Sequence, residues 1–129
     1  MFKPEERTTF KYWFAHWCAF QMTALNHRCW HVRFLLHDAE KPWLRFIWKD
    51  YKKIQRWHRL HSKHHIEYYS KHKKVDWLAM VVDWECCRFT KENAPLTARE
   101  ELERKIKQHP EYEFLFKENI IPILNKYDF

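Results

Sequence analysis

The residues of this chain best suited to chemistry are a histidine and an aspartate side by side, His37 and Asp38, at the end of an apolar, helix-compatible run. A carboxylate buried in such a run is costly unless a cation or hydrogen bonds compensate it. A divalent metal ion is one such compensation, and imidazole with carboxylate is a suitable start to its ligand set. Further ligands stand elsewhere in the chain, at His16, at Asp83 and in a histidine-rich stretch, 58–65. The sequence therefore predicts a metal site assembled from distant segments.

The stretch 58–65 holds four histidines in eight residues. Apolar and aromatic residues flank it, which indicates ordered structure rather than a disordered histidine-rich tract. Histidines can bind a metal ion, contact a phosphate or transfer a proton near neutral pH. We therefore take His61, His64 and His65 as candidates for any of these three roles.

The first ligand, His16, falls on the apolar stripe of a helix predicted from Thr8 or Thr9 to about Ala24. The stripe repeats at steps of three and four residues, which is typical of an amphipathic helix, and consists of Trp13, Trp17, Phe20 and Ala24. The alternative interpretation of His16 is a core histidine that is hydrogen-bonded to the backbone.

A helix over about 27–38 is predicted to carry the central pair, and a further helix over about 42–60 follows it. The boundary is placed at Lys41, because the residue before a proline disfavours helical geometry and Pro42 can open the next helix. His27 and His31 lie four residues apart on the first of these helices, a spacing that can also bind a metal. The second helix is strongly basic, and its charged residues form either a solvated face or an electropositive wall beside an anion site.

Asp83 lies among apolar neighbours on a helix predicted over about 75–89, and a break follows at residues 93–95. Thr97 and Glu100 then form a capping box for a charged helix to about Gln108. A final helix over about 111–127, in which Pro122 can introduce a kink, completes a C-terminal pair that we expect to be scaffold.

The composition favours a single all-α domain over residues 1–129, a bundle of about five to seven helices with its site within about 13–84 and its C-terminal helical pair at about 97–127. Of the 129 residues, 46% are hydrophobic and 19% aromatic, enough for a core and too many for a disordered chain. Glycine is absent, which argues against a turn-rich β fold.

A net charge of +7 with ten further histidines favours anionic partners such as nucleotides, nucleic acid or other phosphorylated molecules. The four cysteines form no CxxC pair, which indicates reduced, buried thiols. No basic-then-apolar leader and no run of ~18 apolar residues occurs. We therefore expect a cytoplasmic protein without a membrane segment.

The order of these ligands resembles the HD superfamily of metal-dependent phosphohydrolases, in which a first His, an adjacent His-Asp pair and a later Asp lie on different helices. The chain also looks like a smaller phage-associated group of HD-like proteins. That group has an HD-x-x-K segment, a Lys-His-His segment and a Met-Val-x-Asp-Trp segment, which are here residues 37–41, 63–65 and 80–84. The match covers about half of the chain. The gap before His37 is shorter than in many HD enzymes, so His27 or His31 is an alternative first ligand, and Pro42 departs from the pattern.

The resemblance implies an HD-domain-like bundle in which His16, His37, Asp38 and Asp83 hold a divalent ion, with Mn, Fe, Co, Ni or Zn favoured over Mg. It implies a hydrolase that cleaves a nucleotide or other phosphomonoester with water that the metal activates. Lys41 would lie near the reacting phosphate, with Lys63 and Arg45 as weaker phosphate contacts. For a phage protein, the expected location is the host cytoplasm.

Two other functions are compatible with the same residues. One is a non-enzymatic basic module that binds nucleic acid or protein on an HD-like scaffold, which the charge and the basic central helix favour. The other is a domain in which the metal only stabilises the fold. The sequence leaves the substrate and the oligomeric state open.

Overall fold

The computed structural model describes residues 1–68, 71–91 and 96–129, and within them the chain is helical, which confirms the all-α prediction. The six α-helices are α1 (Phe10–Asn26), α2 (Glu40–Ile47), α3 (Tyr51–His61), α4 (Lys74–Cys87), α5 (Ala98–Gln108) and α6 (Glu113–Lys126). Three short 3-10 helices are η1 (Pro4–Glu6), η2 (Val32–Leu36) and η3 (Pro110–Tyr112). No helix among the described residues combines the length and the apolar composition that a membrane span requires.

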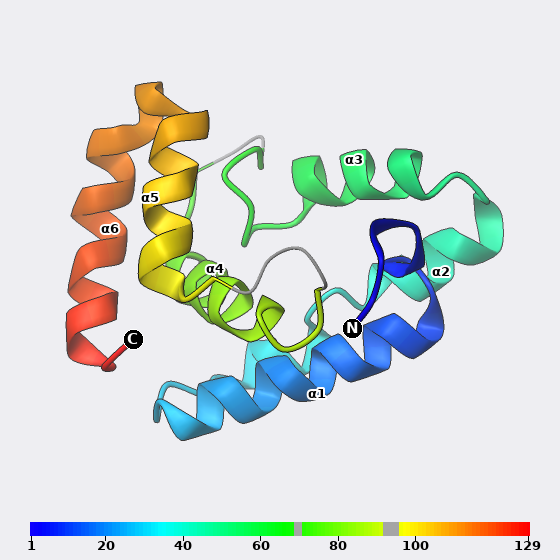
Figure 1. Cartoon of the computed structure of the whole chain (residues 1–129), viewed down its shortest axis with the longest axis horizontal. Coiled ribbons are helices and arrows are strands. Elements are labelled where there is room, and N and C mark those ends of the chain that lie inside the picture. The colour runs from blue at the N-terminus through cyan, green and yellow to red at the C-terminus, as the bar shows by residue number, and fades with distance from the viewer. Residues whose placement is uncertain (69–70, 92–95) are drawn as a thin grey trace.

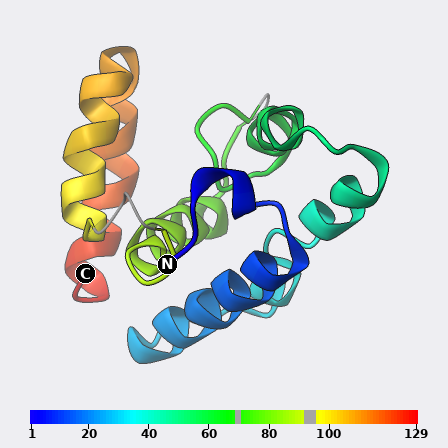
Figure 2. The same ribbon diagram turned by 45° about the vertical axis from the view of Figure 1, so that its right-hand side comes forward.

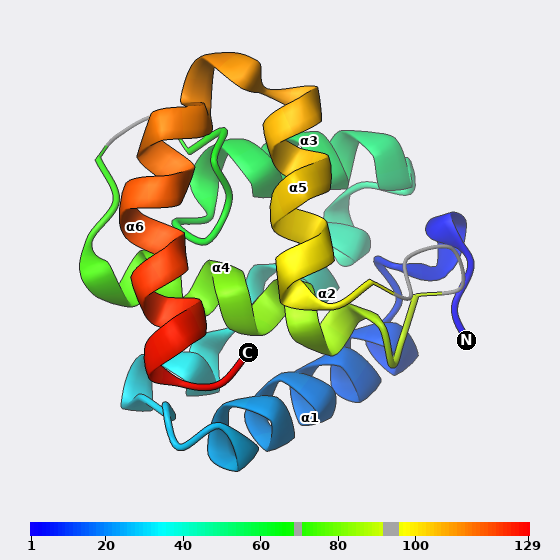
Figure 3. The same cartoon turned by 60° about the vertical axis from the view of Figure 1, so that its left-hand side comes forward.

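Helix α4 is the central element of the fold. It contacts α1 on one side and the hairpin of α5 and α6 on another (Figure 1), and the turned view separates these two neighbours more clearly (Figure 2). In Figure 3 the hairpin crosses α4. A helix with neighbours on several sides must be apolar around most of its circumference. The sequence of α4 meets this requirement, because ten of its fourteen residues are buried.

Two apolar clusters flank α4. The first joins α4 to the hairpin and includes Trp77, Met80 and Phe116, while the second joins α4 to α1 and η2 through residues such as Phe20 and Cys86. All four cysteines are free thiols and three of them are buried, in agreement with the expectation from sequence. The two clusters hold α4 at a fixed position between the N-terminal and C-terminal parts of the chain.

The C-terminal pair of helices forms as predicted. Thr97 caps α5 through the Glu100 amide (3.3 Å), and the Glu100 carboxylate accepts the Thr97 amide (3.3 Å). The helix ends before His109 and Pro110, and α6 continues through Pro122. The break predicted at 93–95 lies outside the described residues.

The helix predicted over 27–38 does not form. Helix α1 continues to Asn26 and ends in a turn, where Arg28 takes a left-handed conformation (φ 57°) and the Cys29 amide donates to Ala24 O (2.9 Å). This closure is typical of a helix C-terminus. Only the short helix η2 follows, so the central His-Asp pair lies in a turn.

The helix predicted over 42–60 is two helices. The chain is extended at Trp48, and Asp50 caps α3 by accepting the Lys52 amide (3.0 Å). The boundary predicted at Lys41 is also wrong, because α2 begins at Glu40 and includes Lys41. Pro42 fits within this first turn because the amide that it lacks would have no partner there.

Burial in the first apolar cluster predicts that two phenylalanines of α6 contribute differently to stability. We expect Phe116→Ala to lower the free energy of unfolding by about 3–5 kcal/mol, because Phe116 is fully buried against α4. Phe114→Ala on the same helix is the control, since Phe114 is 77% exposed, and should change this quantity by about 0.5 kcal/mol or less. Urea unfolding measures both variants, and equal losses would contradict the core assignment.

Candidate metal centre

Four side chains predicted as metal ligands meet inside the molecule. His16 lies in the middle of α1, His37 ends η2, Asp38 follows in the turn, and Asp83 lies on α4. Their exposed fractions are 1%, 6%, 4% and 6%. Ligands from three separate elements therefore converge in a space that is nearly closed to solvent.

The distances among these four side chains are those of atoms around a common cation. His16 Nε2 lies 3.0 Å from His37 Nε2 and 2.8 Å from Asp83 Oδ1, and the latter two atoms are 3.1 Å apart. Asp38 Oδ2 lies 3.5 Å from both nitrogens, and all four side chains offer atoms within 4.8 Å of one another. A cation with ligands at ~2.1 Å separates neighbouring ligand atoms by ~3.0 Å in an octahedron and ~3.4 Å in a tetrahedron. The described residues can thus hold a metal ion here.

Helix α1 positions the turn that carries His37. Three of its side chains, spaced four residues apart, donate hydrogen bonds to backbone carbonyl groups of η2 and the turn after it. These bonds run from Trp13 Nε1 to His37 O (3.2 Å), from Trp17 Nε1 to Leu35 O (3.0 Å) and from Gln21 Nε2 to Phe34 O (2.6 Å). The two tryptophans of the predicted apolar stripe therefore also satisfy backbone carbonyl groups at the end of η2.

The backbone at Asp38 is left-handed, with φ 55°. Aspartate tolerates this region better than most residues, although the conformation carries strain. The turn is closed on both sides, since the Ala39 amide donates to Leu36 O and the Lys41 amide to Asp38 O, each at 3.1 Å. This turn presents the Asp38 carboxylate to the cluster while α2 starts in a new direction.

The two ligand rings on the α1 side are held by packing. The His37 ring stacks on Phe20 with ring centres 3.7 Å apart, and His16 stacks on Tyr12 at 5.4 Å. The second nitrogen of His16, Nδ1, lies 3.8 Å from Cys86 Sγ. A partner at the second nitrogen favours the tautomer whose Nε2 lone pair is available to a metal.

A second cluster of nitrogens faces the other oxygen of Asp38. His58 Nε2 and His64 Nε2 lie 3.0 and 3.1 Å from Asp38 Oδ1. Within the part of the chain that the structure describes, all three atoms are buried and none forms a well-aligned hydrogen bond. His58, His64 and His65 also offer nitrogens within 4.8 Å of one another. Because buried polar atoms rarely lack partners, this arrangement is suited to a second cation that Asp38 would bridge.

His58 and Glu40 are site residues that the sequence interpretation did not assign. Glu40 Oε1 contacts His58 Nδ1, and Ser62 Oγ donates to the same carboxylate at 3.0 Å. Such a carboxylate orients a ligating imidazole. His58 could have been found, since it lies four residues after the buried Ile54 on the inner face of α3. Glu40 had no comparable signal apart from its closeness to Asp38.

Lys41 enters the cluster as a buried cation. Its Nζ lies 3.1 Å from Asp38 Oδ2 and 5.9 Å from the ring centre of Tyr12, and its exposed fraction is 5%. This ammonium group pairs with Asp38, whereas Asp83 is in contact with the imidazoles of His16 and His37. A cation bound among these atoms would compensate both carboxylates directly.

The pKa shifts follow from burial and from these contacts. Burial lowers the pKa of His37 to about 4 and, together with neighbouring His64 and His58, also lowers the pKa of His65. Burial alone would raise the pKa of Asp38, but His37, Lys41 and the other histidines hold it well below its usual value. Burial opposes ionisation of Asp83 too, and the contacts with both ligand histidines lower its pKa overall. The carboxylates stay ionised and His37 stays neutral near pH 7, as metal ligands must.

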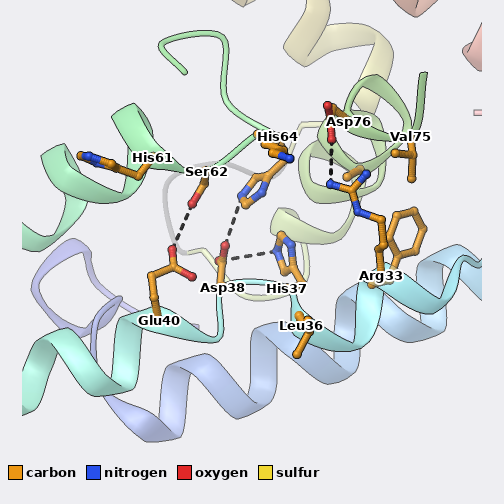
Figure 4. A pocket seen from close by; sticks show the side chains of 13 residues that line it. Arg33, Leu36, His37, Asp38, Glu40, His61, Ser62, His64, Val75 and Asp76 are labelled. Carbon is orange, nitrogen blue, oxygen red and sulfur yellow. Dashed lines mark hydrogen bonds and ion pairs between the residues drawn. The ribbon is translucent and has the colours of Figure 1, made fainter. Parts of the chain in front are cut away.

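A hollow of about 300 Å³ opens beside the cluster (Figure 4). His37, Asp38, Glu40 and His64 line it, and Figure 4 shows the Asp38 carboxylate directed toward both histidines. On its rim Arg33 Nη2 donates to Asp76 Oδ1 at 3.2 Å. The hollow therefore borders the buried carboxylate that the two groups of nitrogens share.

The remaining predicted residues lie at different distances from the cluster. His64 belongs to it and His65 adjoins it, as described above. His61 and Lys63 are exposed and line the rim of the hollow, with the His61 ring stacked on Trp57. Arg45 instead donates to Thr8 Oγ1 (3.2 Å) and Lys49 O (3.3 Å). Of the two predicted phosphate contacts, Lys63 therefore lies on the rim of the hollow and Arg45 forms structural hydrogen bonds.

The alternative first ligands lie away from the centre. His27 Nδ1 donates to Tyr127 O at 2.8 Å, and the His27 ring stacks on Phe129. His31 Nδ1 accepts the Arg33 amide at 3.1 Å. Of the three histidines considered for this position, His16 is the one beside His37.

Comparisons of the chain with protein-family models, with curated proteins and with solved structures found no match. The function of the protein is therefore inferred from the residues of the site.

The buried histidines predict a pH dependence for protein that has been treated with a chelator. The pKa of His37 is about 4 in the folded state and ~6.5 when unfolded, so only the unfolded state binds its proton within that window. The free energy of unfolding should fall as the pH drops from ~6.5 toward ~4. The lowered pKa of His65 also makes the free energy of unfolding fall on acidification, whereas the raised pKa of His64 has the opposite effect.

Urea unfolding across this pH range measures the effect. The change in the free energy of unfolding with pH should be smaller in His37→Gln than in wild type. It should stay the same in His61→Gln, because His61 is exposed. A stability that stays flat or rises on acidification would contradict the buried, neutral state of His37.

Proposed function

We propose that this protein is a metal-dependent phosphohydrolase of the HD type, acting on a phosphorylated small molecule such as a nucleotide. One observation carries the proposal: four ligands predicted from the order His, His-Asp, Asp converge with distances of 2.8–3.5 Å. The same order and the Lys-His-His and Met-Val-x-Asp-Trp segments support the family part of the proposal.

The donor set favours particular metals. Two imidazole nitrogens with two carboxylate oxygens suit Mn, Fe, Co, Ni or Zn, whereas Mg and Ca prefer ligand sets made of oxygen. The histidines that face Asp38 Oδ1 offer a second position with similar donors. When bound, such a cation supplies Lewis acidity and lowers the pKa of water toward neutrality.

The surrounding side chains have roles that follow from their positions. Lys41 is held beside Asp38, where its charge would offset charge that develops on phosphoryl oxygens. His64 lines the hollow and, as an alternative to binding a second cation, can give a proton to the leaving oxygen. Glu40 fixes the orientation of His58. His61 and Lys63, on the rim, would contact the outer part of the substrate.

A second candidate is a binding module for nucleic acid. The observation that favours it is the row of exposed cations on α3, formed by Lys52, Lys53, Arg56 and Arg59. Phosphate contacts of this kind give affinity that falls steeply with salt. Binding of single-stranded DNA that persists in His37→Ala and decreases in Arg56→Gln would favour this function.

The hydrolase proposal predicts that metal and activity are lost together. The protein as purified should contain at least one equivalent of a transition metal and release phosphate from one or more members of a nucleotide panel. The double variant with His37→Ala and Asp38→Ala should lose the metal and at least 100-fold in rate, because two of the four ligands are gone. His61→Ala, on the rim, should retain the metal.

Metal content by mass spectrometry and phosphate release are measured on the same samples, with circular dichroism as the test of folding. Chelation should also lower Tm, since a ligand that binds only the folded state stabilises it. Wild type without metal and without activity would overturn the hydrolase. Metal binding and a chelator-sensitive Tm without turnover would instead indicate a structural metal.

A further inference from the structure

A second hollow reaches the cluster from another side and is lined by cations. Its volume is about 150 Å³, and Asp83 and His65 form part of its wall. Five basic side chains surround it, namely Arg7, Arg59, Lys91, Arg104 and Lys105. None of these five was assigned to the site from the sequence.

The fold brings these cations together from four segments. The Phe2 amide donates to Thr90 O at 2.8 Å, which ties the N-terminal segment bearing Arg7 to the end of α4 beside Lys91. Arg59 comes from the last turns of α3. The other two cations lie on α5, which packs against α4. Because the four segments are far apart in sequence, only the folded chain forms this hollow.

The balance of charge in the hollow is positive. Among the described residues that line it, the acidic side chains are Glu101, which lies 3.5 Å from Arg104, and Asp83, which faces His16 and His37. The Cys87 thiol also lines it, and a hydrogen bond with Cys86 lowers its pKa to about 6. The five basic side chains outnumber these three groups. Like charges gathered around a partly enclosed space repel one another, so the arrangement favours a bound anion.

The size of the hollow limits this anion. At about 150 Å³ the hollow is smaller than the one of about 300 Å³ beside Asp38 and the one of about 470 Å³ beside Arg7. It therefore suits a compact anion, such as one phosphate group, better than a whole nucleotide. A phosphate in the hollow would lie next to Asp83 and His65, one from each of the two groups of metal-binding side chains. A second, linked phosphate would then extend toward the cluster.

We propose that this hollow binds one phosphate of a ligand that carries two or more linked phosphates, such as a nucleoside diphosphate or triphosphate. The anion site is inferred from the basic side chains of the hollow. Its use in binding substrate rests on the proposed hydrolase function. Arg7 and Arg59 also line a neighbouring open hollow of about 470 Å³, where a longer polyanion would bind. The small enclosed volume at Asp83 favours the short polyphosphate over nucleic acid.

The test is calorimetric titration of the full chain with methylenediphosphonate, a probe with two linked phosphonate groups that cannot be hydrolysed between them. We expect wild type to bind it more tightly than inorganic phosphate. The double variant with Arg104→Gln and Lys105→Gln should bind it at least tenfold more weakly, because two cations of the hollow are removed. Lys107→Gln on the same helix is the matched control, since Lys107 is exposed and does not line the hollow.

Metal content measured on the same samples separates this inference from the proposed function. The α5 variants leave the four ligands intact and should keep the metal of wild type. If the purified protein lacks metal but its affinity for the probe depends on Arg104 and Lys105, the anion site stands and the hydrolase fails. Equal affinity in wild type and the double variant, or no binding at all, would overturn the anion site. Tighter binding of a phosphorylated oligonucleotide through the same two residues would overturn the short-polyphosphate assignment.

Discussion

Two carboxylates, Asp38 and Asp83, are buried in the middle of a helical domain, and their compensation is the constraint that orders the rest of the structure. Each would be protonated or expelled to the surface without partners. Helix α1 supplies His16, the turn after η2 supplies His37, and α2 supplies Lys41. His58 of α3 and His64, which follows this helix, reach the second oxygen of Asp38. A cation bound among these side chains would compensate both carboxylates directly.

Helix α4 connects this charged centre to the apolar part of the molecule. Its buried residues contribute to both apolar clusters, and Asp83 sits between them on the same helix. The C-terminal hairpin, expected to act only as scaffold, covers one side of α4. The same hairpin brings two cations of α5 to the second hollow. The same helices therefore contribute both to the apolar core and to the candidate sites.

The four proposed ligands could be predicted because each stands on a segment whose apolar pattern makes an isolated polar residue conspicuous. Helices α1, α4 and α5 were predicted for the same reason. The helix expected over 27–38 failed because the hydrogen bonds from Trp13, Trp17 and Gln21 satisfy the backbone of a 3-10 turn, a tertiary effect that no local pattern reports. Long helices also conceal internal breaks, as at Asp50, where a side-chain cap starts α3.

Other parts of the site could not be predicted in the same way. Within the histidine-rich stretch, composition does not distinguish the inward His58 from the outward His61; only the helical spacing of His58 from Ile54 does. Glu40 acts through a contact with α3 across a turn, 18 residues away. The cations of the second hollow come from four segments, and no spacing along the chain connects them. Their relation exists only in three dimensions.

The separation of His16 from Asp83, 67 positions along the chain, has a consequence for the newly made protein. Three of the four ligands emerge from the ribosome well before the fourth, and closing so long a loop carries an entropic cost that only the docked α4 offsets. The half-made chain offers a cation an incomplete set of donors and holds it weakly. If the site binds the proposed metal, tight capture would therefore follow the docking of α4.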